Sequence, residues 1–318
     1  TLTITVNAVP VAAANTGTTF TTKGAVATLT GSGEADTVTV ATSSATLGAT
    51  VGVISGGGGV DTINVNLKDG GSIEDVDTFE NINIIVNELT GTTSTITWGA
   101  ASHGADTSNN VFLTGGLAGN TTTLSYGIAD RTHDFEIDAS SYKGSIIATF
   151  AEDAFIRSNA NDDLIIRGPV AGTADRINIE YDGNTSGHNS GLFTMTNVET
   201  LSVESHTSSA NTLDLKNVTG LNTIIIDDGG ETGTNLNIDN ATSGLTLQYG
   251  DNQNYVADVD VDLATDGTSD SITIELKNTA TGGSIDTSKF ETVNIVATAG
   301  ASTTTTDSIG IAASSVTA

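Results

Sequence analysis

Apolar and polar residues alternate in many short segments along the chain. Valine, isoleucine and leucine alternate with threonine, asparagine and serine, as in residues 81–84, 94–98 and 271–276. A period of two residues is typical of β-strands that bury one face. This order also argues against disorder, which the high content of threonine, serine and glycine would otherwise favour. The pattern therefore predicts an all-β protein.

The spacing of the strands leaves two architectures open. Short, evenly spaced strands suit either a solenoid or a pair of packed sheets. A sandwich core usually contains large aromatic residues, yet 4% of this chain is aromatic and it has one tryptophan. No long segment carries a helical spacing of apolar residues. We expect an elongated parallel β-solenoid with irregular loops, and tandem β-sandwich domains are the alternative.

A longer motif occurs three times along the chain. Each copy has a glycine-containing turn, an aspartate, a strand, a loop, and a second strand that a glutamate precedes. Fixed sequence units of this kind indicate a repeat architecture. Each recurring glutamate could cap the stack, ligate a metal or face water. Its repetition favours a structural role, and the sequence leaves open which one. The aspartate and glutamate of the three copies are Asp61 and Glu80, Asp175 and Glu199, and Asp270 and Glu291.

The expected organisation of the chain has three parts. Residues 1–18 form an N-terminal strand and linker, which also suits the end of a preceding module. Residues 19–300 form the repeat-built solenoid, and residues 301–318 form a strand or tail rich in threonine, serine and alanine. The first strand would pair either with the first coil of this domain or with a sheet edge of a neighbouring molecule. We expect the glycine- and asparagine-rich stretch 100–120 to be a loop, and the chain to be a fragment or a processed form.

The charge of the chain narrows the possible partners. The 318 residues carry a formal net charge of −28 with 10 basic side chains, too few for a nucleic-acid groove. No apolar run approaches the roughly 18 residues of a membrane-spanning helix, so no membrane insertion is expected. A charge of this size makes the compact state repel itself. Bound calcium is the simplest way to neutralise this charge, because calcium prefers carboxylate and carbonyl oxygen. The absence of cysteine excludes disulfides and thiolate metal sites.

The glycine-containing turns supply the first candidate calcium ligands. Glycine permits the positive φ that such a turn needs, and aspartate supplies a charged oxygen for calcium. In the turn 56–61 we predict Asp61 as the ligand, with the carbonyl groups of Gly57 and Gly59. Ordinary turn chemistry is the alternative, because aspartate and glycine are common turn residues. The equivalent aspartates of the other turns are further candidates: Asp36, Asp175 and Asp270.

A second set of candidate ligands lies in one predicted strand. Asp258, Asp260 and Asp262 alternate with valine, which places three carboxylates on one face of a strand, roughly 6.6 Å apart. Such a face is either solvated or shares a cation with Asp266 or Asp270 of the following turn. The sequence leaves both possibilities open.

The glycine turns also resemble a known repeat family. Residues 56–64 fit the nonapeptide G-G-x-G-x-D-x-U-x at every position, where U is a large apolar residue. The turns at Asp36, Asp175 and Asp270 keep one glycine, the aspartate and the apolar residue. With the threonine-rich strands around it, this motif resembles RTX-type calcium-binding repeats of bacterial surface-layer proteins and large type I-secreted surface proteins. The resemblance implies type I secretion, calcium-triggered folding outside the cell and ordered self-assembly; the scattered copies favour isolated calcium sites over a regular row.

These features predict a structural function. We expect a secreted, calcium-stabilised, self-assembling subunit of a cell-surface layer or filament, whose partners are further copies of itself. The alternative is an adhesin segment that binds glycan, such as cell-surface polysaccharide, or another surface. Regular threonine rows on a flat face would favour ice as that surface, but residues 121–123 and 303–306 are runs and not spaced rows.

An enzymatic function is the third possibility. The chain has no G-x-S-x-G elbow, no H-E-x-x-H motif and no phosphate-binding glycine loop with lysine. A β-helical enzyme acting on polysaccharide would have to use Asp162, Asp163 and Arg167, or Asp175 and Arg176. We therefore expect that the protein is not an enzyme.

Overall fold

The structure is a computed structural model of the chain. It describes residues 3–5, 19–23, 28–30, 35–41, 54–56, 58–68, 72–74, 76–77, 79–87, 93–98, 109–126, 134–150, 163–170, 174–181, 193–205, 211–228, 236–249, 258–277, 281–298, 308–313 and 316–317.

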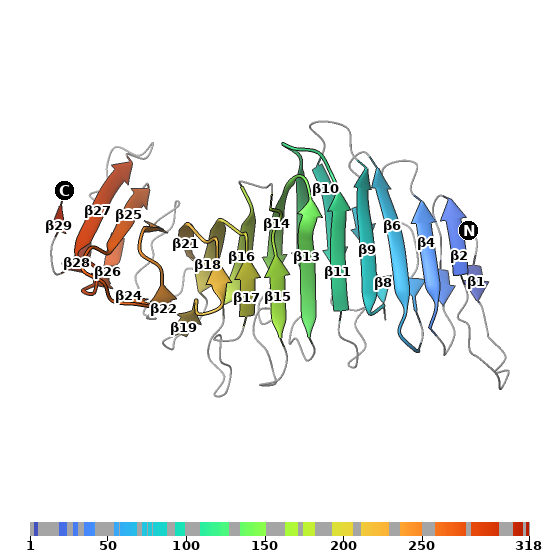
Figure 1. Ribbon diagram of the computed structural model, residues 1–318, viewed down its shortest axis with the longest axis horizontal. Helices are drawn as coiled ribbons and strands as arrows, with labels where there is room; N and C mark the ends of the chain where they lie inside the picture. Colours follow the sequence, from blue (N-terminus) through green and yellow to red (C-terminus); the bar gives the residue numbers. More distant parts are fainter. Residues whose placement is uncertain are drawn as a thin grey trace. The chain divides into compact units, whose positions relative to one another are not determined.

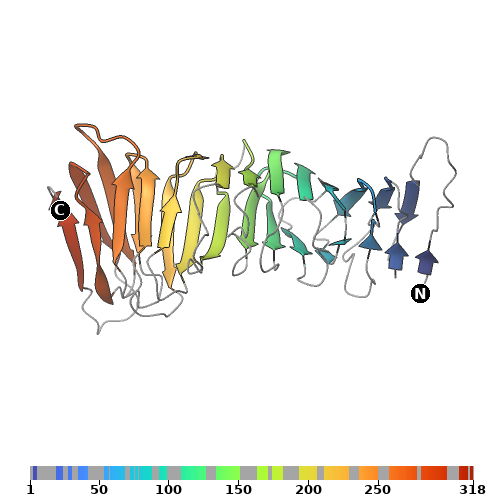
Figure 2. The same ribbon diagram turned by 90° about the horizontal axis from the view of Figure 1, so that it is seen from below.

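All regular secondary structure within these ranges is β-strand, as the alternating pattern predicts. The strands of each sheet are in parallel register with their neighbours (Figures 1 and 2). The predicted class, a parallel β-solenoid, is confirmed, and the alternative of β-sandwich domains, which are antiparallel, is wrong. No helix in the described ranges has the length and hydropathy to cross a membrane. The chain forms two compact units: unit 1 is Thr1–Ala154 with Asn161–Asp175, and unit 2 is Phe155–Ala160 with Arg176–Ala318.

Unit 1 contains strands of three parallel sheets. Its long sheet has the order β2-β4-β6-β9-β11-β13-β15, its short sheet β7-β10-β12-β14, and its N-terminal sheet β1-β3-β5-β8. The strands are β1 (Thr3–Thr5), β2 (Thr19–Lys23), β3 (Thr28–Thr30), β4 (Thr37–Ala41), β5 (Ile54–Ser55), β6 (Thr62–Lys68), β7 (Ser72–Glu74), β8 (Val76–Asp77), β9 (Asn81–Asn87), β10 (Thr93–Trp98), β11 (Asn109–Gly115), β12 (Thr121–Tyr126), β13 (Phe135–Tyr142), β14 (Ser145–Phe150) and β15 (Leu164–Arg167).

The core of unit 1 is built from one face of each strand. Ile63 is in register with Val38 on one side and Ile82 on the other, and all three are buried. Each such aliphatic side chain contributes about 1.5–3 kcal/mol through removal from water. Tyr126 and Phe135 add an aromatic contact to this core, with ring centroids 4.4 Å apart.

Two expectations about unit 1 have clear outcomes. The first strand pairs within the chain, because β1 is in parallel register with β3, as the first-coil alternative predicts. The expected loop at 100–120 is wrong where β11 forms between β9 and β13. The buried Val111 and Leu113 give this short segment the same alternation as its neighbours, and the surrounding glycine and asparagine mask it in the sequence.

Unit 2 repeats the same construction. Its long sheet has the order β16-β18-β21-β23-β25-β27-β29, its acidic sheet β19-β22-β24-β26-β28, and β17 pairs with β20. Successive strands of the long sheet stack Ile177, Leu201, Ile224, Leu247 and Ile274 in one buried row. The strands are β16 (Arg176–Tyr181), β17 (Phe193–Thr196), β18 (Thr200–Ser205), β19 (Asn211–Asp214), β20 (Val218–Thr219), β21 (Thr223–Asp228), β22 (Leu236–Ala241), β23 (Leu245–Tyr249), β24 (Val259–Leu263), β25 (Ser271–Lys277), β26 (Thr281–Thr287), β27 (Thr292–Thr298), β28 (Ser308–Ala313) and β29 (Val316–Thr317).

Candidate cation sites at the entrances of the strands

The acidic residues of the sequence motif share one structural position, the residue immediately before a strand. In unit 1, Asp61 precedes β6 and Glu80 precedes β9, and these strands pair in register. In unit 2, Asp270 precedes β25 and Glu291 precedes β27, and these strands also pair. Each aspartate and its following glutamate therefore occupy equivalent positions on neighbouring coils. Asp36, Asp175 and Glu199 stand at the same position before β4, β16 and β18.

In unit 1 these acidic residues form a column that ties successive coils together. The backbone N–H of Asp36 donates a hydrogen bond to Oδ1 of Asp61, at 2.6 Å. The backbone N–H of Asp61 in turn donates to Oε2 of Glu80, also at 2.6 Å. Bonds from a backbone N–H to an ionised carboxylate are stronger than neutral ones. The repeated glutamate of the motif thus has a structural role that the sequence did not define: its carboxylate accepts the N–H of the preceding coil.

Asp61 is the most constrained member of this column, which we call the carboxylate column (Asp36, Asp61 and Glu80). Its side chain is fully buried, and within the described part of the chain its Oδ2 has no hydrogen-bond partner. Burial raises the pKa of Asp61 to about 6, and the charges of Glu80 and Asp36 raise it further against the opposing backbone hydrogen bond from Asp36. A buried carboxylate oxygen without a partner is costly, so this atom is suited to hold a proton or a cation.

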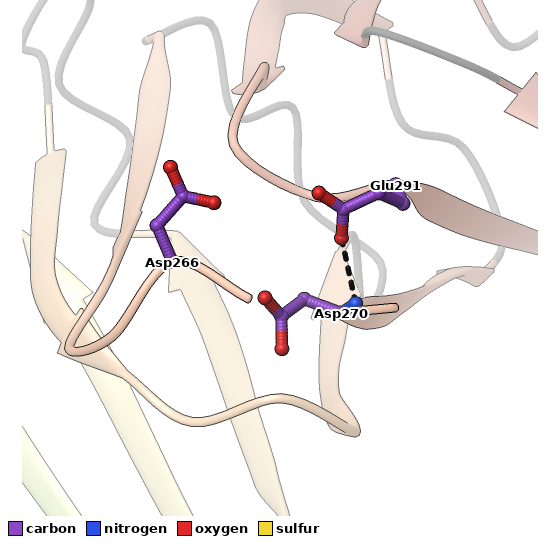
Figure 3. Close-up of side chains that lie close together, drawn as sticks. All are labelled: Asp266, Asp270 and Glu291. Atoms are coloured by element: carbon purple, nitrogen blue, oxygen red, sulfur yellow. Dashed lines mark hydrogen bonds between the residues drawn. The ribbon is translucent and has the colours of Figure 1, made fainter. Parts of the chain in front are cut away.

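In unit 2 the equivalent pair gains a third carboxylate. The backbone N–H of Asp270 donates to Oε2 of Glu291 at 2.7 Å, as in unit 1. Asp266, from the turn between β24 and β25, adds its carboxylate, so that one oxygen of each of the three side chains lies within 4.8 Å of the others (Figure 3). Asp266 is exposed, and Asp270 and Glu291 are half-buried. We call these three residues the acidic triad.

In the turn that carries the triad, one glycine contacts the Asp270 carboxylate. The backbone N–H of Gly267 donates to Oδ2 of Asp270 at 2.6 Å. A Cβ atom at Gly267 would lie 2.8 Å from that same oxygen, closer than real Cβ contacts. A larger residue here would therefore require the Asp270 carboxylate to move, and glycine allows the turn to keep this bond.

The other predicted ligands have varied surroundings. Asp175 is fully buried, and its Oδ1 accepts the backbone N–H of Ile146 at 2.7 Å. Gly59 is exposed with φ of 108°, as a glycine turn requires, whereas Gly57 lies outside the described residues. The proposed role of Gly57 and Gly59 carbonyls as calcium ligands stays a prediction.

Asp258, Asp260 and Asp262 do not join Asp266 and Asp270 in one cluster within the described residues. Oδ1 of Asp258 accepts both the backbone N–H and the hydroxyl of Ser284. The ammonium group of Lys289 lies 2.6 Å from Oδ1 of Asp262. The acidic triad takes its third carboxylate from Glu291 instead, a recurrent residue for which the sequence left metal ligation open as one of three roles.

The outward face of the acidic sheet nevertheless concentrates negative charge. Burial and the nearby Asp262 and Asp286 raise the pKa of Asp260. The charge of Asp239 also raises this pKa, and the charge of Lys289 lowers it. Burial, Asp262 and Asp214 likewise raise the pKa of Asp239. We call this surface the acidic face; its carboxylates are Asp214, Asp239, Asp260, Asp262 and Asp286.

The residues that an enzyme would need have structural partners in the described ranges. Arg167 forms an ion pair with Glu136, and the Arg176 guanidinium donates to Asn178 and Ser202. Asp162 lies outside the described residues. A cavity of about 210 Å³ in unit 2 has no titratable side chain in its lining, which is Leu215, Val218, Thr219, Gly220, Leu221, Asn240, Thr242 and Leu245.

Fold and site together define a class: a parallel β-solenoid with carboxylates at the entrances of its strands. No family model, no curated protein and no solved structure matches the chain.

Proposed function

We propose that this chain is a calcium-stabilised structural protein of the cell surface that assembles with copies of itself into a layer or filament. The acidic triad is the observation that carries the proposal. Three carboxylates that converge within 4.8 Å supply the hard oxygen ligands that calcium prefers, and water or carbonyl oxygen completes its six to eight ligands.

The position of the triad couples calcium binding to folding. Asp266 and Asp270 come from one turn, whereas Glu291 comes from the start of the next coil of the long sheet. The three carboxylates meet only when β25 and β27 are paired, so calcium binds the folded state in preference to the unfolded chain. Selective binding of this kind stabilises the folded state as the calcium concentration rises. In a chain with a net charge of −28, bound calcium also reduces self-repulsion.

Secretion and a cell-surface location come from the resemblance to RTX-type surface proteins. The physical argument agrees with it, because low calcium leaves the acidic chain less stable and high external calcium favours the fold. Enzymatic activity is not part of this proposal.

Electron microscopy tests the proposal on the full chain. Purified protein at millimolar calcium is expected to form ordered sheets or fibres, and the same protein in chelator with matched magnesium is expected to stay dispersed. Monomers of uniform size under both conditions would contradict assembly. Identical assembly with and without calcium would contradict the role of calcium.

A further inference from the structure

Part of one face of unit 1 carries no charged side chain among the described residues, although the chain as a whole is strongly acidic. Charge returns on the next strand of the same sheet, where Glu136 and Asp138 of β13 are in register with Asn110 and Phe112. The outward-facing side chains of β4, β6, β9 and β11 alternate with buried aliphatic residues. All of these outward residues with described side chains, except the terminal Asn87, form what we call the neutral array: Thr37, Thr39, Thr62, Asn64, Asn66, Asn81, Asn83, Ile85, Asn110, Phe112 and Thr114.

Strands β4, β6, β9 and β11 lie side by side in the long sheet (Figure 1). Their register arranges the array in rows across the sheet. One row runs through Thr37, Thr62, Asn81 and Asn110. The neighbouring row runs through Thr39, Asn64, Asn83 and Phe112. Nδ2 of Asn83 donates to Oδ1 of Asn64 at 2.9 Å. Stacked asparagines of this kind form ladders that pack well against another sheet.

The array also contains two apolar groups that reach its surface. Ile85 is 39% exposed, and Phe112 is half-buried. Ile85 is in register with Thr114, and Phe112 with Asn83, so both groups lie on paired strands β9 and β11. Phe112 lies on β11, the edge strand of the array, and buried aromatic side chains commonly contribute to the binding energy of a contact area.

Charge decides which partner fits such a surface. Two copies of a chain with a net charge of −28 repel each other, and like charges brought face to face cost several kcal/mol. Contact through the acidic face would set carboxylates against carboxylates. Contact through the neutral array would bury threonine, asparagine, Ile85 and Phe112, and none of these residues is charged. The nearest carboxylates on this face, Glu136 and Asp138, lie at the β13 edge of the array.

We propose that the neutral array packs face to face against the neutral array of a second copy of this chain. The inference rests on the proposed self-assembly and deepens it by assigning one of its contacts. The contact is isologous, because both copies contribute the same surface. It therefore forms a closed pair of chains, and the larger assembly contains many such pairs.

The size of the array sets the strength of this contact. Four strands about 4.8 Å apart, with outward residues about 6.7 Å apart along each strand, cover roughly 400 Å² per copy. Stable interfaces bury about 800 Å² per partner. The isolated pair is therefore weak, and it gains strength where an assembly repeats it with other contacts.

Charge insertion at matched positions tests the proposal. In the full chain, Thr39→Glu combined with Thr62→Glu places two carboxylates on diagonal positions of the array. Thr93→Glu combined with Thr123→Glu is the control, because these residues are diagonal neighbours on the short sheet of the same unit. Both variants change the net charge equally, and circular dichroism melting curves check that both are folded.

Sedimentation velocity over a concentration series in calcium is the measurement. The array variant is expected to pair at least about tenfold more weakly than the wild type, and the control is expected to pair as the wild type does. Added sodium chloride is expected to strengthen pairing of the wild type, because screening weakens the repulsion between copies and the contact contains no ion pair.

Two results would overturn the inference while leaving self-assembly intact. One is equal pairing of the array variant, the control and the wild type. The other is unchanged pairing of the array variant combined with loss of binding to ice or insoluble polysaccharide, which would assign the array to a different ligand. A wild type that stays monomeric at every concentration would overturn the proposed function as well.

Cysteine crosslinking gives a second readout, in which unfolding is not mistaken for a loss of pairing. The chain has no cysteine, so a single Thr62→Cys substitution gives one thiol on the array, and Thr123→Cys gives its control on the short sheet. With a short thiol-reactive crosslinker, the array variant is expected to form covalent dimers several-fold faster than the control. Equal rates would overturn the inference.

Discussion

The carboxylate column of unit 1 and the acidic triad of unit 2 use the same bond in different surroundings. In both, an aspartate N–H donates to the glutamate of the next coil, at 2.6 Å and 2.7 Å. Asp61 is fully buried, whereas Asp270 is half-buried and meets the exposed Asp266. The shared bond is therefore a tie between coils. The triad differs by an additional carboxylate that solvent can reach, and for this reason we propose it as the calcium site.

Removing the tie in unit 1 is expected to have the largest effect. Glu80→Ala leaves the N–H of the buried Asp61 position without its acceptor, which costs about 1–3 kcal/mol in the free energy of unfolding. Urea unfolding followed by circular dichroism measures the loss. Glu80→Gln keeps an oxygen acceptor and is the control, expected to lose much less. Equal losses for alanine and glutamine would show that the carboxylate acts through its charge and not through this hydrogen bond.

Removing the equivalent tie in unit 2 is expected to cost less in the absence of calcium. In Glu291→Ala in chelator, water can replace the lost acceptor of the Asp270 N–H, because Asp270 is only half-buried. The expected loss in the free energy of unfolding is therefore about 0.5–1.5 kcal/mol. The same urea titration compares it with Glu80→Ala. A larger loss for Glu291→Ala would reverse the assignment of the buried column as the stronger tie.

The pH dependence of stability separates the two sites further. The folded state holds the pKa of Asp61 at about 6, above the value near 3.9 of an unfolded chain. The folded state therefore binds this proton more tightly, and stability from Asp61 rises as the pH falls through about 6 towards about 4. Melting temperatures are compared in chelator at pH 7 and pH 5. The rise in melting temperature from pH 7 to pH 5 is expected to be smaller for Asp61→Asn than for the wild type. Equal gains would mean that Asp61 is not the group that titrates.

The sequence predicted the strand-entry carboxylates because their chemistry is local. Asp36, Asp61, Asp175 and Asp270 follow glycine-containing turns, and each stands immediately before its strand as expected. The partners of these residues were not predictable, since they depend on which coil stacks on which. Glu80 and Glu291 were recognisable as repeated residues, but their acceptor role requires the register of β6 with β9 and of β25 with β27.

Surface rows were hidden for the same reason. The run 121–123 suggests consecutive threonines, yet Thr122 is buried and hydrogen-bonded to Tyr142. The spaced rows arise across strands, where Thr37 meets Thr62 and Thr200 meets Thr223. The run 303–306 lies outside the described residues. A period of two predicts which side chains face outward, but only strand register determines which of them become neighbours.

Calcium dependence of the wild type and Asp266→Asn tests the central claim most directly. Thermal unfolding is followed by circular dichroism at millimolar calcium and in chelator, with magnesium matched. We expect chelation to lower the melting temperature of the wild type by several degrees, and to change that of Asp266→Asn much less. Asp258→Asn, whose carboxylate bonds to Ser284, is the control and is expected to respond to calcium as the wild type does. A wild type whose melting temperature does not change on chelation would contradict the account, and the acidic residues of the turns would then serve only the hydrogen bonds between coils.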